Sequence, residues 1–289
     1  MRPSGAGPAR AVRQDTAGGT VPALTTGLTA RLIACFDVVE GRVTKARRFE
    51  DNIDVGDAAQ IAASVYEDGI DEIIFYDILA SAHRRQADLV TIRAVAEQVF
   101  VPLTVGGGIR SLHDMHAVLD AGAEKISLDS MAVRNPGIIA QGSAEFGRQC
   151  IVQSMQVKRV PVRPEIPSGY EVFIDGARQA TGMDAVAWAR RGEDLGAGEI
   201  CINSIDQDGT HQGYDLEITR AIAKAVNLPV IASGGAGSAE HAAAAFTEAG
   251  ASAAIVSSLL YSPRMERTLP VGEIKGELAK RYGLPVRLV

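Results

Sequence analysis

Eight short apolar runs alternate with helical patterns along most of the chain, and this alternation constrains the fold more than any other feature. The runs are nearly continuously apolar, which is typical of strands that are buried on both faces. Amphipathic stretches such as DAAQIAASVYEDGI (57–70) lie between them. The eight candidate strands cover residues 31–38, 72–78, 103–107, 125–130, 150–155, 198–205, 229–235 and 253–258.

A unit of strand then helix that occurs eight times predicts an α/β fold in which a parallel sheet closes into a (βα)8 TIM barrel. An open doubly wound sheet is the alternative, but no Gly-x-Gly-x-x-Gly motif follows the first strand. We expect the barrel to occupy residues 29–289. Residues 1–28 are rich in Gly, Ala, Pro and Thr, and we expect a disordered N-terminal extension there, with an organellar targeting peptide as the alternative.

The chain also repeats itself. VPLTVGGGIRSLHDMHAVLDAGA (101–123) resembles LPVIASGGAGSAEHAAAAFTEAGA (228–251) in its proline, its paired glycines and its closing Ala-Gly-Ala. The preceding segments DEIIFYDI and GEICINSI match as well. This predicts a half-barrel internal repeat in which strands three and four correspond to strands seven and eight. Repeated structure in turn predicts repeated sites.

Glycines and serines at the ends of the repeated strands predict two phosphate sites. Ligands of such barrels bind at the C-terminal ends of the strands. Glycine there lets backbone N–H groups approach an anion, and the following helix start favours phosphate. The candidate phosphate-binding residues are Gly107, Gly108, Asp129, Ser130, Gly209, Ser233, Gly234, Gly235, Ser257 and Ser258.

Carboxylates at other strand ends are the candidates for acid–base chemistry. Asp37 closes the first strand, and Lys45 follows eight residues later. An acid at the end of an apolar strand is unfavourable unless it functions or is paired, so Asp37 is a general acid/base or part of a structural salt bridge. Asp208 is a catalytic candidate or only shapes the turn beside Gly209, and Asp77 is equally ambiguous.

Composition excludes several classes of function. The net charge is −6 and no basic run of five residues occurs, which argues against a nucleic-acid surface. The same charge favours a cytoplasmic protein. No apolar stretch approaches the roughly 18 residues of a membrane helix. Cys35, Cys150 and Cys201 lie in or beside apolar runs and predict buried thiols. Neither the cysteines nor the five histidines have the spacing of a metal site.

Six motifs occur in order with the spacing of one family: ACFDVVEGRVTK, FYDILAS, VGGGI, SIDQDGT, GYD and ASGGAG. Together they resemble the cyclase subunit of imidazole glycerol phosphate synthase, from about Arg31 to the C-terminus. The resemblance implies a lyase-type cyclisation in histidine biosynthesis. Ammonia from a partner glutaminase, in a heterodimer, would attack a small bisphosphorylated ribulosyl-imidazole substrate. No metal or organic cofactor is implied.

The resemblance also implies roles for individual residues. Asp37 stands at the position of the catalytic acid/base on strand one, and Lys45 matches the lysine of the loop that closes over substrate. The four charged residues of the family's ammonia gate are matched by Arg31, Glu72, Lys125 and Glu199.

One catalytic position departs from the family. Gln156 stands where a second catalytic aspartate ends strand five, and glutamine cannot exchange a proton as a carboxylate does. Losing one acid/base group typically reduces the rate by roughly 10²–10⁴-fold. Asp129-Ser130 also replaces Asn-Thr, which adds a carboxylate that could supply replacement chemistry or repel a phosphate.

Two alternatives therefore stand beside the histidine-pathway cyclase. One is a cyclase-like paralogue acting in another pathway (a nucleotide-like natural product or sugar amidation), and the other is a non-catalytic ammonia conduit that activates a glutaminase.

Overall fold

The structure is a computed structural model that describes residues 28–47, 50–82, 87–263, 265 and 267–288. Its parallel strands are β1 (Arg31–Val39), β4 (Glu72–Asp77), β5 (Leu103–Gly106), β6 (Lys125–Leu128), β7 (Ile151–Arg159), β10 (Glu199–Ser204), β11 (Val230–Ser233) and β12 (Ala253–Ile255). They pair in this order, and β12 pairs with β1, so the sheet is closed. The predicted (βα)8 TIM barrel is confirmed. The N-terminal extension expected at residues 1–28 lies outside the described residues, apart from its last residue.

Strand alternation separates two apolar regions. On β1, Leu32, Ala34 and Phe36 belong to the large core between the strands and the surrounding helices. Ile33 and Cys35, which point the other way, belong to a second cluster inside the barrel with residues of β4, β7, β10, β11 and β12. Because both faces of each strand are buried, the strand sequences are nearly continuously apolar.

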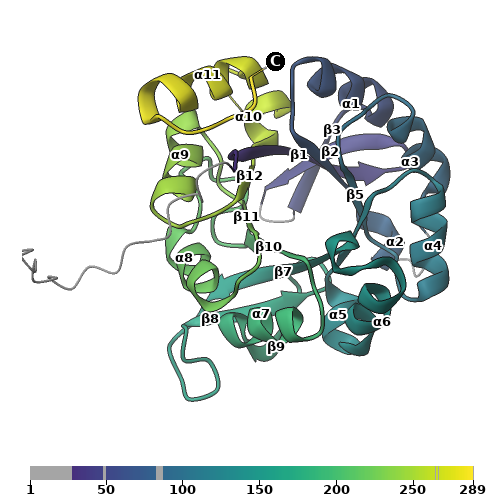
Figure 1. Cartoon of the computed structure of the whole chain (residues 1–289), viewed down its shortest axis with the longest axis vertical. Coiled ribbons are helices and arrows are strands. Elements are labelled where there is room, and N and C mark those ends of the chain that lie inside the picture. Colours follow the sequence, from purple (N-terminus) through teal and green to yellow (C-terminus); the bar gives the residue numbers. More distant parts are fainter. Residues whose placement is uncertain (1–27, 48–49, 83–86, 264, 266, 289) are drawn as a thin grey trace, which may run out of the picture.

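Helices surround the strands on the outside of the barrel (Figure 1). Ser111 caps α4 by accepting from the Asp114 N–H, and Ser238 caps α9 by accepting from the His241 N–H. These serines are equivalent in the two repeated segments, so the repeat extends to the helix caps. The helices are α1 (Ala58–Glu67), α2 (Ile78–Ala82), α3 (Leu89–Ala96), α4 (Leu112–Asp120), α5 (Ser130–Arg134), α6 (Gly137–Phe146), α7 (Ala185–Asp194), α8 (Leu216–Ala225), α9 (Ala239–Thr247), α10 (Ser257–Tyr261) and α11 (Val271–Tyr282), with a 3-10 turn at Arg148–Cys150.

Two antiparallel hairpins extend the barrel at its C-terminal end. The first, β2 (Arg42–Arg47) and β3 (Glu50–Asp57), follows β1, and β2 pairs with β1. The second, β8 (Tyr170–Ile174) and β9 (Gln179–Asp184), follows β7, and β8 pairs with β7. The eight-strand prediction did not include these hairpins. They follow the first and fifth barrel strands, which are equivalent in a half-barrel repeat, and they bring residues over the ligand side.

Several barrel strands end earlier than predicted. β5 ends at Gly106 because Gly107 turns the chain with φ +88°, and a Cβ atom at Gly107 would lie 2.2 Å from the Asp77 carbonyl oxygen. Gly234 has φ +92°, and a Cβ atom there would lie 2.8 Å from the Ser204 carbonyl oxygen. Both glycines are thus required for close packing against the neighbouring strand end, whatever ligand the turns bind.

Candidate functional site

A pocket lies at the C-terminal ends of the barrel strands, mainly between β1, β10, β11 and β12. It contains nine of the residues that the sequence predicts for the site: Asp37, Lys45, Asp208, Gly209, Ser233, Gly234, Gly235, Ser257 and Ser258. These residues come from five separate segments of the chain. The pocket therefore unites the predicted acid/base group, the loop lysine and one of the two predicted phosphate sites.

Asp37 of β1 and Lys45 of β2 form an ion pair, with 3.4 Å between Lys45 Nζ and Asp37 Oδ2. The Lys45 side chain is 12% exposed and that of Asp37 is 30% exposed. Burial opposes the charge of Lys45, but Tyr261 and the Asp37 carboxylate outweigh it and keep the pKa of Lys45 above its ordinary value. A charged ammonium group thus faces an acid at the wall of the pocket.

Tyr261, at the end of α10, holds this lysine in place. Lys45 Nζ lies 5.6 Å from the centroid of the Tyr261 ring, which suits a cation–π contact. The Tyr261 hydroxyl donates to the carbonyl oxygen of Cys35 in β1. Sequence reasoning missed Tyr261, because nothing in the local pattern of α10 indicates that its side chain reaches back to the first strand.

Turns after β10, β11 and β12 form the part of the pocket that suits an anion. Gly209, Gly234 and Gly235 all have positive φ, so their backbone approaches the pocket without side chains. Ser257 Oγ accepts from the Cys35 N–H at 2.6 Å, which fixes this serine against β1. Ser258 follows at the pocket wall. Backbone N–H groups and hydroxyls in this arrangement are typical of phosphate sites.

The other predicted phosphate site lies apart from this pocket. Gly107, Gly108, Asp129 and Ser130 follow β5 and β6 and are not among the residues that line it. The turn between β8 and β9 covers this side: Ser130 Oγ accepts from the Asp175 N–H at 3.0 Å. Asp175 also forms an ion pair with Arg134 of α5. The two halves of the barrel thus differ at their ligand ends.

Gln156 and Asp129 are in direct contact. Gln156 Nε2 donates to Asp129 Oδ2 at 2.5 Å, and Gln156 Oε1 accepts from the Ala177 N–H in the β8–β9 turn. Burial raises the pKa of Asp129 to about 7, although the hydrogen bond from Gln156 opposes this shift. Asp129 Oδ1 is shielded from solvent and has no hydrogen-bond partner among the described residues.

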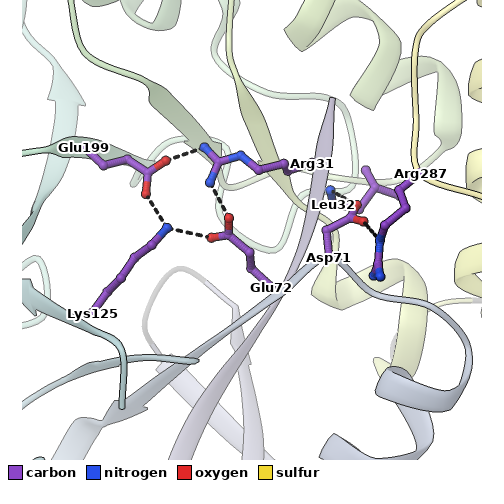
Figure 2. Close-up of polar contacts among 7 residues, drawn as sticks. All are labelled: Arg31, Leu32, Asp71, Glu72, Lys125, Glu199 and Arg287. Atoms are coloured by element: carbon purple, nitrogen blue, oxygen red, sulfur yellow. Dashed lines mark hydrogen bonds and ion pairs between the residues drawn. The ribbon is translucent and has the colours of Figure 1, made fainter. Parts of the chain in front are cut away.

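At the opposite end of the barrel, four charged side chains form a closed ring (Figure 2). Arg31 contacts both Glu72 and Glu199. Lys125 Nζ lies 3.1 Å from a carboxylate oxygen of each glutamate and closes the ring. The glutamates are nearly buried and the cations partly so, which makes the four charges mutually dependent. All four residues predicted for a gate are therefore together at the N-terminal ends of their strands.

Asp71 anchors the C-terminal segment beside this ring (Figure 2). Its Oδ1 accepts from Lys275 Nζ at 2.6 Å and from Arg287 Nε at 3.1 Å, and its Oδ2 accepts from the Leu32 N–H at 2.9 Å. Lys275 is fully buried and belongs to α11. This second charged cluster joins the last helix to β1 and lies outside the ring.

Polar groups inside the barrel lie between the ring and the pocket, and sequence reasoning did not identify them. The Tyr76 hydroxyl lies 3.0 Å from Ser127 Oγ and donates to Ser154 Oγ at 3.4 Å. Tyr76, Ser154, Cys35 and Cys201 line the inner end of the pocket. The signal for them is the strand alternation itself, since Tyr76 lies two residues after Ile74 on the inward face of β4.

Asp77 is a structural residue. Its Oδ1 accepts from the Ala80 N–H and its Oδ2 from the Asp88 N–H, both at 3.0 Å.

The three cysteines are free thiols, with Cys35 and Cys201 buried and Cys150 only partly so. Within the described part of the chain, no cluster of three or more His, Cys, Asp or Glu side chains could hold a metal ion. None of the described helices has the length and apolar character needed to cross a membrane.

Comparison with known proteins agrees with this architecture. Residues 31–266 match the family described as "Histidine biosynthesis protein". The imidazole glycerol phosphate synthase subunit HisF of Desulfosudis oleivorans is 51% identical over 261 residues, covering 90% of this chain and 99% of that protein. The subunits of the same name from Desulfovibrio desulfuricans and Nitratidesulfovibrio vulgaris are 55% and 54% identical over 234 residues, covering 81% of this chain and 90% of each relative. The chain belongs to the histidine biosynthesis protein family.

Proposed function

We propose that this protein is the cyclase subunit of an imidazole glycerol phosphate synthase. In this proposal it is a lyase-type enzyme that works with a glutaminase and acts on a bisphosphorylated ribulosyl-imidazole substrate. The observation that carries the proposal is the pocket in which Asp37 and Lys45 face the glycine and serine turns of β10, β11 and β12. The high identity to relatives named as synthase subunits supports the same conclusion.

The pocket supports a division of roles. Gly209, Gly235 and Ser258 would bind one phosphate of the substrate, and Gly108 and Ser130 would bind the other, since the Ser130 hydroxyl can donate to a phosphate while it accepts from the Asp175 N–H. Lys45 would hold the substrate, and the Asp37 carboxylate beside it would accept a proton from the attacking ammonia. Asp208 would complete the pocket wall beside Asp37.

The ring of Arg31, Glu72, Lys125 and Glu199 supports a route for ammonia. The ring lies at the N-terminal end of the barrel and the pocket lies at the C-terminal end, and the hydroxyl groups of Tyr76, Ser127 and Ser154 lie between them. A glutaminase that docks against the N-terminal end would deliver ammonia to the ring. Opening the ring would admit ammonia to a polar interior that leads to the substrate.

Gln156 favours a second candidate function, a cyclase-like enzyme of another pathway. A neutral carboxamide stands where the resemblance implies a catalytic carboxylate, while the charged ring is complete. Such changes at the ligand end suit an altered substrate, such as a nucleotide-like precursor or a sugar that is aminated.

Complementation separates the two candidates. The full-length gene is expressed in a histidine auxotroph that lacks its cyclase subunit but retains its glutaminase, beside a plasmid carrying Asp37→Asn. Growth with the wild type and none with Asp37→Asn supports the histidine-pathway cyclase. No growth with the wild type, although the purified protein stimulates the glutaminase, supports the second candidate.

The Asp37→Asn variant also tests a non-catalytic conduit. If the protein only activates a glutaminase, it cannot support growth of a strain that lacks its cyclase. In the native host, replacing Asp37 then leaves the output of the protein's pathway unchanged, because the ring at the other end of the barrel is intact.

A further inference from the structure

The ligand end of the barrel contains two carboxyl groups in unlike surroundings. Asp37, on β1, is partly exposed and forms an ion pair with Lys45. Asp129, which follows β6, has no cation within hydrogen-bond distance: its Oδ2 accepts from a neutral amide and its Oδ1 is shielded and without a partner among the described residues. Two carboxyl groups whose environments differ in this way commonly divide the roles of base and acid.

Gln156 fixes the orientation of the Asp129 carboxyl. Gln156 Oε1 accepts from the Ala177 N–H, so its Nε2 must be the atom that faces Asp129. A flipped amide would bring two donors together at Ala177 and two acceptors together at Asp129. Oδ2 of Asp129 is therefore held as an acceptor, and Oδ1 is the atom that carries or receives a proton.

The groups around Asp129 hold its pKa close to neutral pH. Burial and the Asp175 carboxylate raise the pKa of Asp129, while Gln156 and Arg134 lower it, and the balance lies at about 7. Arg134 forms an ion pair with Asp175, and this limits how far Arg134 lowers the pKa of Asp129. The Cys201 thiol on β10 also faces this group, and its own raised pKa keeps it neutral. Asp129 can thus hold a proton near neutral pH.

Gln156 and Asp129 do not line the pocket themselves, but Gln156 is next to two residues that do, on the side away from Asp37. Gln156 pairs in register with Asn203 of β10, and Asn203 lines the pocket. Ser154, two residues before Gln156 and on the same face of β7, lines it as well. In the closed order of strands, β7 lies opposite β1, and β6 is its neighbour. A substrate in the pocket would therefore lie between Asp37 and the pair.

From these contacts we infer that Asp129 is the second acid/base group of the reaction and that Gln156 is the residue that positions it. The inference rests on the proposed function. When ammonia attacks a substrate carbonyl, a C–N bond forms and the C=O π pair moves to oxygen. Asp129 gives that oxygen a proton and Asp37 takes one from nitrogen. When water leaves, Asp37 returns its proton to the departing oxygen, and Asp129 regains one from nitrogen. The sum is carbonyl plus ammonia to imine plus water, and both carboxyl groups are restored.

The test measures turnover of the bisphosphorylated ribulosyl-imidazole substrate with ammonium chloride between pH 5.5 and 9, expressed per free ammonia. The wild type is expected to lose activity as pH rises through about 7, where Asp129 loses its proton. We call this fall in activity the alkaline limb of the pH profile. The isosteric Asp129→Asn variant is expected to lose roughly 10²–10⁴-fold in kcat and to lack this limb. Thermal unfolding and stimulation of the glutaminase show that the variant is folded.

Two further variants should move the limb in opposite directions. Gln156→Ala removes a hydrogen bond that lowers the pKa of Asp129, so the limb moves to higher pH. Asp175→Asn removes a charge that raises this pKa, so the limb moves to lower pH. A merely structural role for Gln156 would reduce activity without moving the limb.

The possible failures are distinguishable. Asp129→Asn with turnover within threefold of the wild type and the same limb would overturn the assignment of Asp129 and leave the proposed function standing. No turnover of this substrate by the wild type at any pH would overturn both.

Discussion

Asp129 accepts a hydrogen bond from Gln156 at 2.5 Å, and this contact links the ends of two neighbouring barrel strands at the ligand side. The oxygen of the same amide, Gln156 Oε1, accepts from the Ala177 N–H. The family resemblance implies a carboxylate at this position of β7. In this chain the position holds Gln156, and the carboxyl group that it contacts belongs to Asp129 after β6.

The raised pKa of Asp129 should make the stability of the fold depend on pH. Its pKa is about 7 in the folded protein and near 4 in the unfolded chain, so the folded state binds the proton more tightly between these values. The free energy of unfolding should therefore fall as pH rises from 4 to 7, by roughly 4 kcal/mol at most from this group. Urea unfolding at pH 5 and pH 8 measures the effect. Asp129→Asn, which has no charge to bury, should reduce the difference, and an unchanged difference would contradict the assigned environment.

Lys125 should couple the glutaminase to the pocket. Lys125→Met leaves Glu72 and Glu199 with only Arg31, and breaking such a network typically costs about 3–5 kcal/mol. We expect the ratio of glutamine-dependent to ammonium-dependent turnover to change at least tenfold, because the ring no longer closes. Lys275→Met is the matched control, since it removes another lysine paired with a carboxylate at this end of the barrel. It should lower the melting temperature and leave the ratio as it was.

Lys45 should contribute to substrate binding more than to folding. Its ammonium group pairs with Asp37 and lies over Tyr261 at the pocket wall. Lys45→Met keeps the aliphatic stem and removes the charge, so we expect kcat/KM to fall by roughly tenfold to a hundredfold, with unfolding changed by less than about 1 kcal/mol. Tyr261→Phe keeps the ring beside Lys45 and removes only the hydroxyl, so it should have a smaller effect on kcat/KM. An equal loss in both variants would contradict a direct role for the ammonium group.

Gly235 should tolerate no side chain. It has φ +98°, and a Cβ atom there would lie 2.0 Å from the Gly213 carbonyl oxygen. Gly235→Ala should destabilise the fold by roughly 3 kcal/mol. Gly276 lies within α11 with nothing within 4 Å of the added atom, so Gly276→Ala should stabilise by roughly 0.5–1 kcal/mol. Denaturant unfolding of the two variants gives both signs, and similar destabilisation in both would contradict this packing argument.

The barrel could be predicted from the sequence because both faces of its strands are buried. RLIACFDV and GEICINSI are apolar on both faces, and this signal does not depend on detailed side-chain contacts. The hairpins could not be predicted in this way. β2 and β9 consist of RVTKAR and QATGMD, which have no apolar run, since these strands pack at the rim of the barrel.

The glycine turns are the part of the candidate site that the sequence indicates most directly. Gly234 and Gly235 were predicted from the paired glycines after a strand, and the structure shows that both have positive φ. Contacts between distant side chains were not predictable. The motif places Asp129 at a strand end, but only the fold brings it against Gln156 and the β8–β9 turn. Likewise, Tyr261 reaches Cys35 across 226 positions of sequence.

The most direct test of the account follows nitrogen from glutamine to product. The wild-type protein and a glutaminase are supplied with the bisphosphorylated substrate, amide-15N glutamine and excess unlabelled ammonium chloride, and the imidazole product is examined by mass spectrometry. We predict imidazole glycerol phosphate that carries 15N from glutamine, because ammonia passes the ring of Arg31, Glu72, Lys125 and Glu199 without mixing with solvent. No imidazole product, or a product labelled only as the bulk ammonium is, would contradict the account.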